Sequence, residues 1–335
     1  MVTGIRLWAV FSVTSFCASV IYGNIDQKDS SNTLPGIIFV PGDGGSQIEA
    51  KLNKPTTVHY VCTQKSDAYF DLWLNMELLA PYVIDCWVDN MKLLYNRTTR
   101  KTTNNLGVET RIPGFGNSDT VEWLDPSHRY PTGYFKDIAN ALIPLGYERG
   151  TTIRGAPFDF RKAPNELGDY FLQLRRLVED TYQTTGQKVV FVAHSMGSPV
   201  LQVFLNQQAQ HWKDKHIRAF VSLAGAWGGA IKAMKVFASG DNLGIYVIQS
   251  KSLRAEQRAS PSLAFLLPNP EIWGSDYILA QTPTTNYTTA NWNDFFSCMH
   301  EYLSQCGRKF FINTVHIIWC PMSMVINTVY EIKFQ

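Results

Sequence analysis

The sequence has little charge and no extended basic stretch. Asp, Glu, Lys and Arg make up 17% of the 335 residues, and the formal net charge is only +2. Lys and Arg never occur in a run longer than a pair. Because nucleic acid needs clustered positive charge, we expect no nucleic-acid partner. A hydrophobic content of 45% also excludes a disordered or fibrous chain. The length suits one large α/β domain or two smaller ones.

The N-terminal apolar stretch is too short, and wrongly flanked, for a membrane-spanning helix. Arg6 precedes residues 7–11, and mostly apolar sequence without charge continues to Tyr22. A basic start followed by an apolar core and small residues is typical of a secretory signal peptide. We therefore expect residues 1–23 to be a signal peptide cleaved near Asn24, with an uncleaved anchor as the alternative. The expected location is the secretory pathway, in the lysosome or outside the cell.

The cysteines take their meaning from that location. Cys17 leaves with the signal peptide, and an odd number remains. Cys62 and Cys86 flank an aromatic-rich stretch and could close a loop in an oxidising compartment. An odd total is unusual in a secreted protein. The other three cysteines lie close together near the C-terminus, and their pairing stays open: Cys298, Cys306 and Cys320.

A buried-strand pattern that stops at a serine dominates the middle of the chain. Residues 189–192 are consecutive apolar residues, typical of a strand buried on both faces of a parallel sheet. A helical pattern follows Ser195. A strand that feeds a helix through a tight turn with serine at its apex is the nucleophile elbow of α/β-hydrolases. The turn needs small residues two places before and after the serine, and Ala193 and Gly197 occupy those places. An ordinary turn serine is the alternative.

An early strand over residues 36–40 ends in a glycine-rich loop, residues 41–46. Hydrolases of this kind place one N–H of the oxyanion hole in such a loop, and the second N–H belongs to the residue after the nucleophile, here Met196. The sequence lacks the Gly-Lys-Ser/Thr that a phosphate-binding loop requires, so that interpretation of the glycines is excluded.

The rest of the chain alternates between helix and strand patterns. Helices are expected over 134–145, 170–185 and 197–210, and strands over 152–154 and 217–223. This alternation predicts a doubly wound, mostly parallel sheet.

Two segments interrupt the alternation. We interpret residues 57–111, which are irregular and aromatic, as an insertion that carries a disulfide loop. Its apolar residues Leu72, Trp73 and Leu74 could contact a bilayer, or they could simply be core. Residues 226–296 are interpreted as a cap segment. Each segment has one glycosylation sequon, at Asn96 and Asn286.

Several motifs, in order, resemble the lecithin–cholesterol acyltransferase family. Two further stretches, residues 212–217 and 238–242, resemble its lysosomal phospholipase A branch. The resemblance covers residues 34–296. The family motifs are Val40-Pro41-Gly42-Asp43, residues 47–52, Arg154-Gly155-Ala156-Pro157, Asp159-Phe160-Arg161, residues 193–197 and Trp227-Gly228-Gly229.

The resemblance implies an α/β-hydrolase fold with a cap and a membrane-binding loop. Ser195 would be the nucleophile, the backbone N–H groups of Asp43 and Met196 the oxyanion hole, and Cys62 and Cys86 a disulfide pair. The implied reaction is a two-step acyl transfer from a glycerophospholipid to water or to a lipid alcohol. The implied partners are a phospholipid membrane surface and the lipid acyl donor and acceptor. We expect no metal or organic cofactor, and a monomer.

The acid and base of the catalytic triad should follow the nucleophile in this fold. The resemblance places them in the C-terminal third, in an Asp-Gly turn and at a later histidine, and neither context is present. His211 and His216 lie at or past the far end of a helix, roughly 20 Å from Ser195. His300 and His316 have no recognisable acid partner. The triad Asp and His are therefore unknown, and we expect little or no turnover; the alternative is a catalytically inactive lipid-binding relative.

Residues 297–335 match nothing in the family pattern and form a divergent tail. Residues 310–330 contain no Asp, Glu, Lys or Arg, long enough for a bilayer but marginal for insertion because of several polar residues. We favour a C-terminally truncated or alternatively spliced product, or a misjoined gene model, over an anchor.

Overall fold

The computed structural model describes residues 33–129, 132–245, 248–281, 285–291, 294–297 and 330–331. The predicted signal peptide, residues 1–23, lies outside this part of the chain. So does nearly all of the predicted tail, including its histidines and cysteines: His300, His316, Cys298, Cys306 and Cys320.

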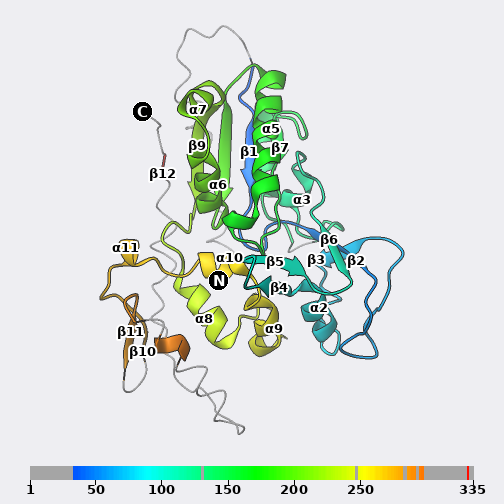
Figure 1. Ribbon diagram of the computed structural model, residues 1–335. Helices are drawn as coiled ribbons and strands as arrows, with labels where there is room; N and C mark the ends of the chain where they lie inside the picture. Colours follow the sequence, from blue (N-terminus) through cyan, green and yellow to red (C-terminus); the bar gives the residue numbers. More distant parts are fainter. Residues whose placement is uncertain are drawn as a thin grey trace, which may run out of the picture.

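A five-stranded sheet in the order β12-β9-β8-β1-β7 forms the centre of the molecule (Figure 1). Four of its strands pair in parallel, and β12 is antiparallel to β9. The expectation of a mostly parallel sheet is thus confirmed. The strands are β1 (Ile37–Val40), β7 (Ile153–Gly155), β8 (Val189–His194), β9 (Ile217–Leu223) and β12 (Tyr330–Glu331).

Both faces of this sheet are buried. Successive residues of a strand point to opposite faces, and those of β1 belong alternately to two separate core clusters. Ile38 and Val40 pack with residues of α5 (Gly168–Thr185) and α6 (Gly197–Asn206). Ile37 and Phe39 face the opposite way, toward α3 (Asp119–Glu122) and α4 (Lys136–Leu142), and Phe39 stacks on Phe135 with ring centroids 4.7 Å apart.

The predicted helices are present, with one correction. Two glycines with left-handed backbone end helices as expected: Gly146 after α4 and the 3-10 turn η1 (Ile143–Leu145), and Gly186 after α5. The helix expected over 197–210 ends early, since α6 stops at Asn206, and a separate helix, α7 (Gln210–His216), follows it. A second short turn, η2 (Pro164–Glu166), precedes α5.

The insertion over residues 57–111 contains regular structure that its irregular pattern hid. Beyond one end of the central strands in Figure 1, β2, β3 and β6 form a small sheet, α2 lies beside it, and β4 pairs with β5. A disulfide joins Cys62 to Cys86 of α2, with Cα atoms 5.4 Å apart. The bounds are β2 (Ile48–Leu52), β3 (Phe70–Trp73), α2 (Ile84–Met91), β4 (Leu93–Asn96), β5 (Lys101–Asn104) and β6 (Val108–Arg111).

Arg161 holds the insertion against the main domain. Its side chain is fully buried and pairs with Asp159 at 2.8 Å. The guanidinium also donates to the carbonyl oxygen of Met91 and to Oγ1 of Thr110, both at 3.0 Å. A buried charge is tolerated only when it is paired and hydrogen-bonded, so this motif fixes three segments to one another.

The cap segment lies at the same end of the sheet as the insertion (Figure 1). None of the helices in the described ranges is long and apolar enough to cross a bilayer. The cap elements are α8 (Ile231–Ser239), α9 (Ser250–Gln257), α10 (Pro261–Phe265), α11 (Pro270–Trp273), β10 (Ile278–Gln281) and β11 (Asn286–Thr288).

Candidate active site

Ser195 occupies a strained turn between β8 and α6. Its φ is +52°, a left-handed conformation that costs a non-glycine residue about 1–3 kcal/mol and persists only where the surroundings impose it. Here they do. The Ser195 N–H donates to the carbonyl oxygen of Leu223 at 2.9 Å, and the Ser195 carbonyl accepts from the N–H groups of Ser198 and Ala226, both at 3.1 Å. These backbone hydrogen bonds therefore hold the turn in its left-handed conformation.

The spacing of small residues around Ser195 has a steric cause. A Cβ on Gly197 would lie 2.3 Å from the carbonyl oxygen of Pro41, so only glycine lets the loop after β1 approach the start of α6. A Cβ on Gly42 would lie 2.8 Å from Cβ of Ser195 and 3.4 Å from its Oγ. The backbone of residues 41–46, called the oxyanion loop below, thus lies directly against the serine.

Two backbone N–H groups near Ser195 have no acceptor within the part of the chain that the structure describes. Among the hydrogen bonds between described residues, none uses the N–H of Asp43 or of Met196. Met196 is also the N-cap of α6, where the helix dipole favours negative charge. The N–H groups of Asp43 and Met196 are thus free of acceptors among the described residues, and their role as oxyanion donors stays a prediction.

The side chain of Asp43 reaches solvent but is surrounded by dense protein. This desolvation raises its pKa to about 6, and nearby Lys232 lowers it in part. Asp43 thus combines a proposed oxyanion donor, its backbone N–H, with a carboxyl group whose pKa is raised.

The predicted membrane contact at residues 72–74 is corrected by the structure. Leu72 is fully buried, Trp73 is 8% exposed, and Leu74 is half-buried against the same core. The Trp73 ring packs on Trp87 and Phe160, and its Nε1–H donates to the carbonyl oxygen of Gly44 at 2.8 Å. The core alternative was the right one, and Trp73 supports the oxyanion loop instead of facing lipid.

Tyr134 also contacts the oxyanion loop, which the sequence did not reveal. Its hydroxyl accepts a hydrogen bond from the Gly42 N–H at 3.0 Å and is also hydrogen-bonded to Nδ1 of His194. In the sequence, Tyr134 is only the first residue of a predicted helix, residues 134–145. Because its partners lie 92 and 60 residues away, no local signal could have found them.

No described side chain is hydrogen-bonded to Oγ of Ser195. His216 is buried in α7, where Nδ1 contacts the Trp212 carbonyl at 2.9 Å and the ring packs on Tyr182, so it is a core residue. His300 and His316 lie outside the described residues. The triad acid and base therefore stay unassigned. In the part of the chain described, no group of three or more His, Cys, Asp and Glu could hold a metal ion.

Both predicted glycosylation sites are accessible. Asn96 at the end of β4 and Asn286 at the start of β11 are exposed. Their modification stays a prediction.

A profile of the family described as "Lecithin:cholesterol acyltransferase" matches residues 69–316. The chain belongs to this family. The match begins after the first two family motifs, residues 40–43 and 47–52. It continues past Phe296 into residues 297–335, which the sequence motifs alone had placed outside the family. Lysosomal phospholipase A and acyltransferase of Mus musculus is 51% identical over 262 residues, covering 78% of this chain and 64% of the relative. Its Homo sapiens counterpart is 50% identical with the same coverage.

A second kind of relative is more distant. Phosphatidylcholine-sterol acyltransferase of Gallus gallus is 42% identical over 267 residues, covering 80% of this chain and 64% of that protein. This chain thus spans about 64% of the length of these relatives.

Proposed function

We propose that the chain has an α/β-hydrolase fold and is a serine acyl hydrolase and acyltransferase that acts on glycerophospholipid. The observation that carries the proposal is the strained turn at Ser195, with two unengaged backbone N–H groups beside it. The names of the relatives, lysosomal phospholipase A and acyltransferase and phosphatidylcholine-sterol acyltransferase, support the substrate class.

In the first step, Ser195 Oγ attacks the ester carbonyl carbon of the phospholipid. The carbonyl oxygen gains negative charge, which the N–H groups of Asp43 and Met196 stabilise. The ester C–O bond then breaks, and the lysophospholipid leaves as an alcohol that carries the proton lost by Ser195. The acyl group is now bound to the serine.

In the second step, water or a lipid alcohol attacks the acyl-serine carbonyl. Water gives a free fatty acid, and a lipid alcohol gives an acylated lipid. In both cases the attacking hydroxyl loses its proton and Ser195 Oγ regains one, so the enzyme returns to its starting state.

A second candidate function is lipid binding without turnover. It is favoured by one observation: the described residues place no hydrogen-bond acceptor on Ser195 Oγ, and a serine hydroxyl is a weak nucleophile until a base takes its proton. The chain would then bind phospholipid with the same site and release it unchanged.

The membrane-facing surface is proposed to lie on the disulfide loop. Large apolar side chains there are exposed, by 90% for Tyr60 and 87% for Tyr82. Val58 and Val61 are exposed beside Tyr60, and the Cys62–Cys86 bond holds this segment to α2. Exposed apolar side chains grouped in one place mark an interaction surface. A lysosomal or extracellular location is part of this proposal, and the name of the Mus musculus relative supports the lysosome.

Labelling of the purified full chain with a fluorophosphonate probe tests the proposal. We expect label at Ser195, none in Ser195→Ala, and wild-type labelling in the control Ser239→Ala, whose serine is exposed at the end of α8. Hydrolysis of phospholipid vesicles should follow the same pattern. Vesicle binding without label or turnover in the wild type would favour the second candidate. Label on another serine would overturn the assignment of Ser195.

A further inference from the structure

We infer that Tyr134 is a positioning residue for the oxyanion hole: its hydroxyl fixes the oxyanion loop so that the Asp43 N–H faces the reacting carbonyl. This inference rests on the proposed function, since it concerns the same site. It adds a residue that neither the sequence motifs nor the relatives' names assign.

The hydroxyl of Tyr134 makes two hydrogen bonds that fix its orientation. It accepts from the Gly42 N–H, so its own proton is available for Nδ1 of His194. Burial lowers the pKa of His194, which keeps the ring neutral and Nδ1 able to accept. Burial raises the pKa of Tyr134, so the phenol keeps its proton. The result is a directed chain of hydrogen bonds that runs from the Gly42 N–H of the loop through the Tyr134 hydroxyl to Nδ1 of His194, next to the nucleophile.

The oxyanion loop is held on both sides of Asp43. Before Asp43, the Gly42 N–H is bound by Tyr134. After it, the Gly44 carbonyl is bound by Trp73. The Gly42 carbonyl also accepts from the Gly45 N–H at 3.0 Å, which closes the turn around Asp43. With these groups engaged, the direction of the Asp43 N–H is set by its neighbours.

The Tyr134 ring touches the loop as well as its hydroxyl. A Cβ on Gly45 would lie 2.7 Å from Cε1 of Tyr134, so the ring packs directly on the Gly45 backbone. Tyr134→Phe keeps this packing and removes one oxygen atom. That substitution therefore separates the hydrogen bond from the contact.

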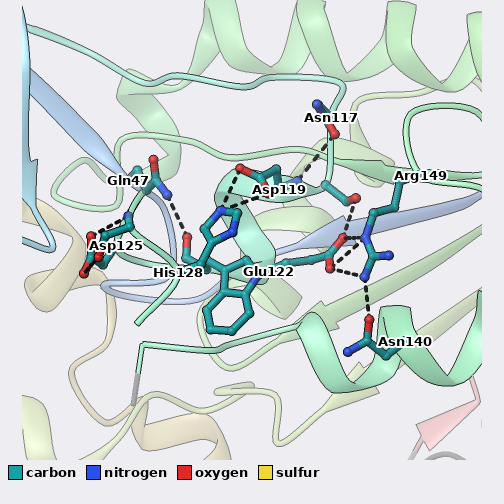
Figure 2. A network of polar contacts seen from close by, with 11 residues as sticks. Gln47, Asn117, Asp119, Glu122, Asp125, His128, Asn140 and Arg149 are labelled. Atoms are coloured by element: carbon teal, nitrogen blue, oxygen red, sulfur yellow. Dashed lines mark hydrogen bonds and ion pairs between the residues drawn. The ribbon is translucent and has the colours of Figure 1, made fainter. Parts of the chain in front are cut away.

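A polar network anchors the segment that carries Tyr134 (Figure 2). The Tyr134 N–H donates to the carbonyl oxygen of Glu122 at 2.7 Å. Glu122 is buried and paired with Arg149 at 2.6 Å. Gln47, which directly follows the oxyanion loop, donates from Nε2 to the carbonyl oxygen of Trp123 at 2.9 Å. The loop is therefore attached to Tyr134 through Gly42, and Gln47, the residue that follows the loop, is attached to Trp123.

Loss of the Tyr134 hydroxyl should reduce transition-state stabilisation more than substrate binding. The Asp43 N–H would remain but lose its fixed direction. Removal of a whole oxyanion donor costs about 10²–10³ in kcat, so we expect a fall of about tenfold or more in kcat and little change in KM.

The test compares Tyr134→Phe with wild type and with Tyr95→Phe in the full chain. Tyr95 is an exposed tyrosine in β4, away from the site, and its variant is the matched control. Three quantities are measured: kcat and KM on a water-soluble short-chain ester, the melting temperature, and amide hydrogen exchange of a peptide that covers residues 41–46. We expect Tyr134→Phe to lower kcat at unchanged KM, to keep its melting temperature within a few degrees, and to exchange faster over 41–46 alone.

The outcomes separate this inference from the proposed function. Wild-type kcat in Tyr134→Phe, or a lower kcat with unchanged exchange over 41–46, overturns the positioning role. If the wild type does not turn over the ester, the proposed hydrolase function fails. The amide exchange of residues 41–46 then decides alone whether Tyr134 positions the loop. Faster local exchange in Tyr134→Phe then supports the role, and unchanged exchange overturns it.

Discussion

Trp73 donates its indole N–H to the carbonyl oxygen of Gly44 at 2.8 Å, one residue beyond the proposed oxyanion donor Asp43. This bond connects the insertion to the candidate active site. β3, which carries Trp73, pairs with β2, and β2 follows the oxyanion loop along the chain. The insertion therefore forms one wall of the site, in addition to any contact it makes with lipid.

Trp73→Ala should damage the fold and the site together. The side chain is nearly buried, and truncation of a buried tryptophan costs about 3–5 kcal/mol of unfolding free energy. Urea denaturation measures this loss. Activity on a soluble ester and on vesicles should fall equally, because the oxyanion loop loses its support in both assays.

The matched control for Trp73 is Tyr60→Ala. Tyr60 is 90% exposed on the disulfide loop, so its removal should change stability by less than about 0.5 kcal/mol. It should weaken vesicle binding and leave turnover of a soluble ester intact. Unchanged vesicle binding in Tyr60→Ala would remove the support for a membrane surface on this loop.

Gly197→Ala should abolish labelling of Ser195. The new methyl group would lie 2.3 Å from the Pro41 carbonyl oxygen, so the oxyanion loop and α6 must separate. A displacement of about 1 Å can cost about 10² in rate, and we expect at least that loss in the probe labelling rate. Gly168→Ala is the control, because nothing lies within 4 Å of its added Cβ. Equal labelling rates in the two variants would contradict the steric account of the turn.

Removal of the disulfide should destabilise the chain without abolishing folding. The bridge spans 24 residues, which corresponds to about 3 kcal/mol in the chain-entropy model. The double variant Cys62→Ser/Cys86→Ser should unfold at a lower urea concentration, and its free energy of unfolding should be smaller by that amount. Identical midpoints for the variant and the wild type, with the wild type shown to be oxidised, would refute a stabilising bridge.

The sequence predicted the elements whose signals are local. The apolar run of β8, the small residues Ala193 and Gly197, and the glycines that end α4 and α5 each act within a few residues of chain. The position of Trp73 could not be predicted, because it depends on Trp87 and Phe160, which come from α2 and from the loop after β7. An aromatic residue in an irregular pattern is equally compatible with core and surface until its partners are known.

Long-range polar contacts could not be predicted from the sequence for the same reason. Neither the hydrogen bond of Tyr134 to Gly42 nor the ion pair of Glu122 with Arg149 follows from spacing or periodicity. The break between α6 and α7 was missed because apolar spacing continues across it, to Trp212 of the buried core. The turn that carries the nucleophile could be predicted, and the residues that hold the oxyanion loop could not.

Glu256 of the cap should make the protein more stable at acidic pH than at neutral pH. Its side chain is buried, and desolvation together with the charges of Asp43 and Asp159 raises its pKa to about 7, against the effects of Arg161 and of a hydrogen bond from Ser260. Because the folded-state pKa lies above the unfolded value of 4.5, the native state holds this proton more tightly. The stabilisation is full below about pH 4.5 and is lost as the pH rises through 7.

Glu256→Gln isolates that effect, since the amide resembles the protonated acid in shape and does not titrate. The full shift corresponds to about 3 kcal/mol at 1.36 kcal/mol for each pKa unit. We therefore expect the variant to match the wild type near pH 4.5 and to exceed it by a few kcal/mol near pH 8. Urea denaturation of both proteins at several pH values measures the difference, in which contributions from groups that do not interact with Glu256 cancel. A constant difference in unfolding free energy across this range would show that the pKa of Glu256 is not raised in the folded protein. The cap would then contain no buried acid at position 256 that becomes charged only near neutral pH.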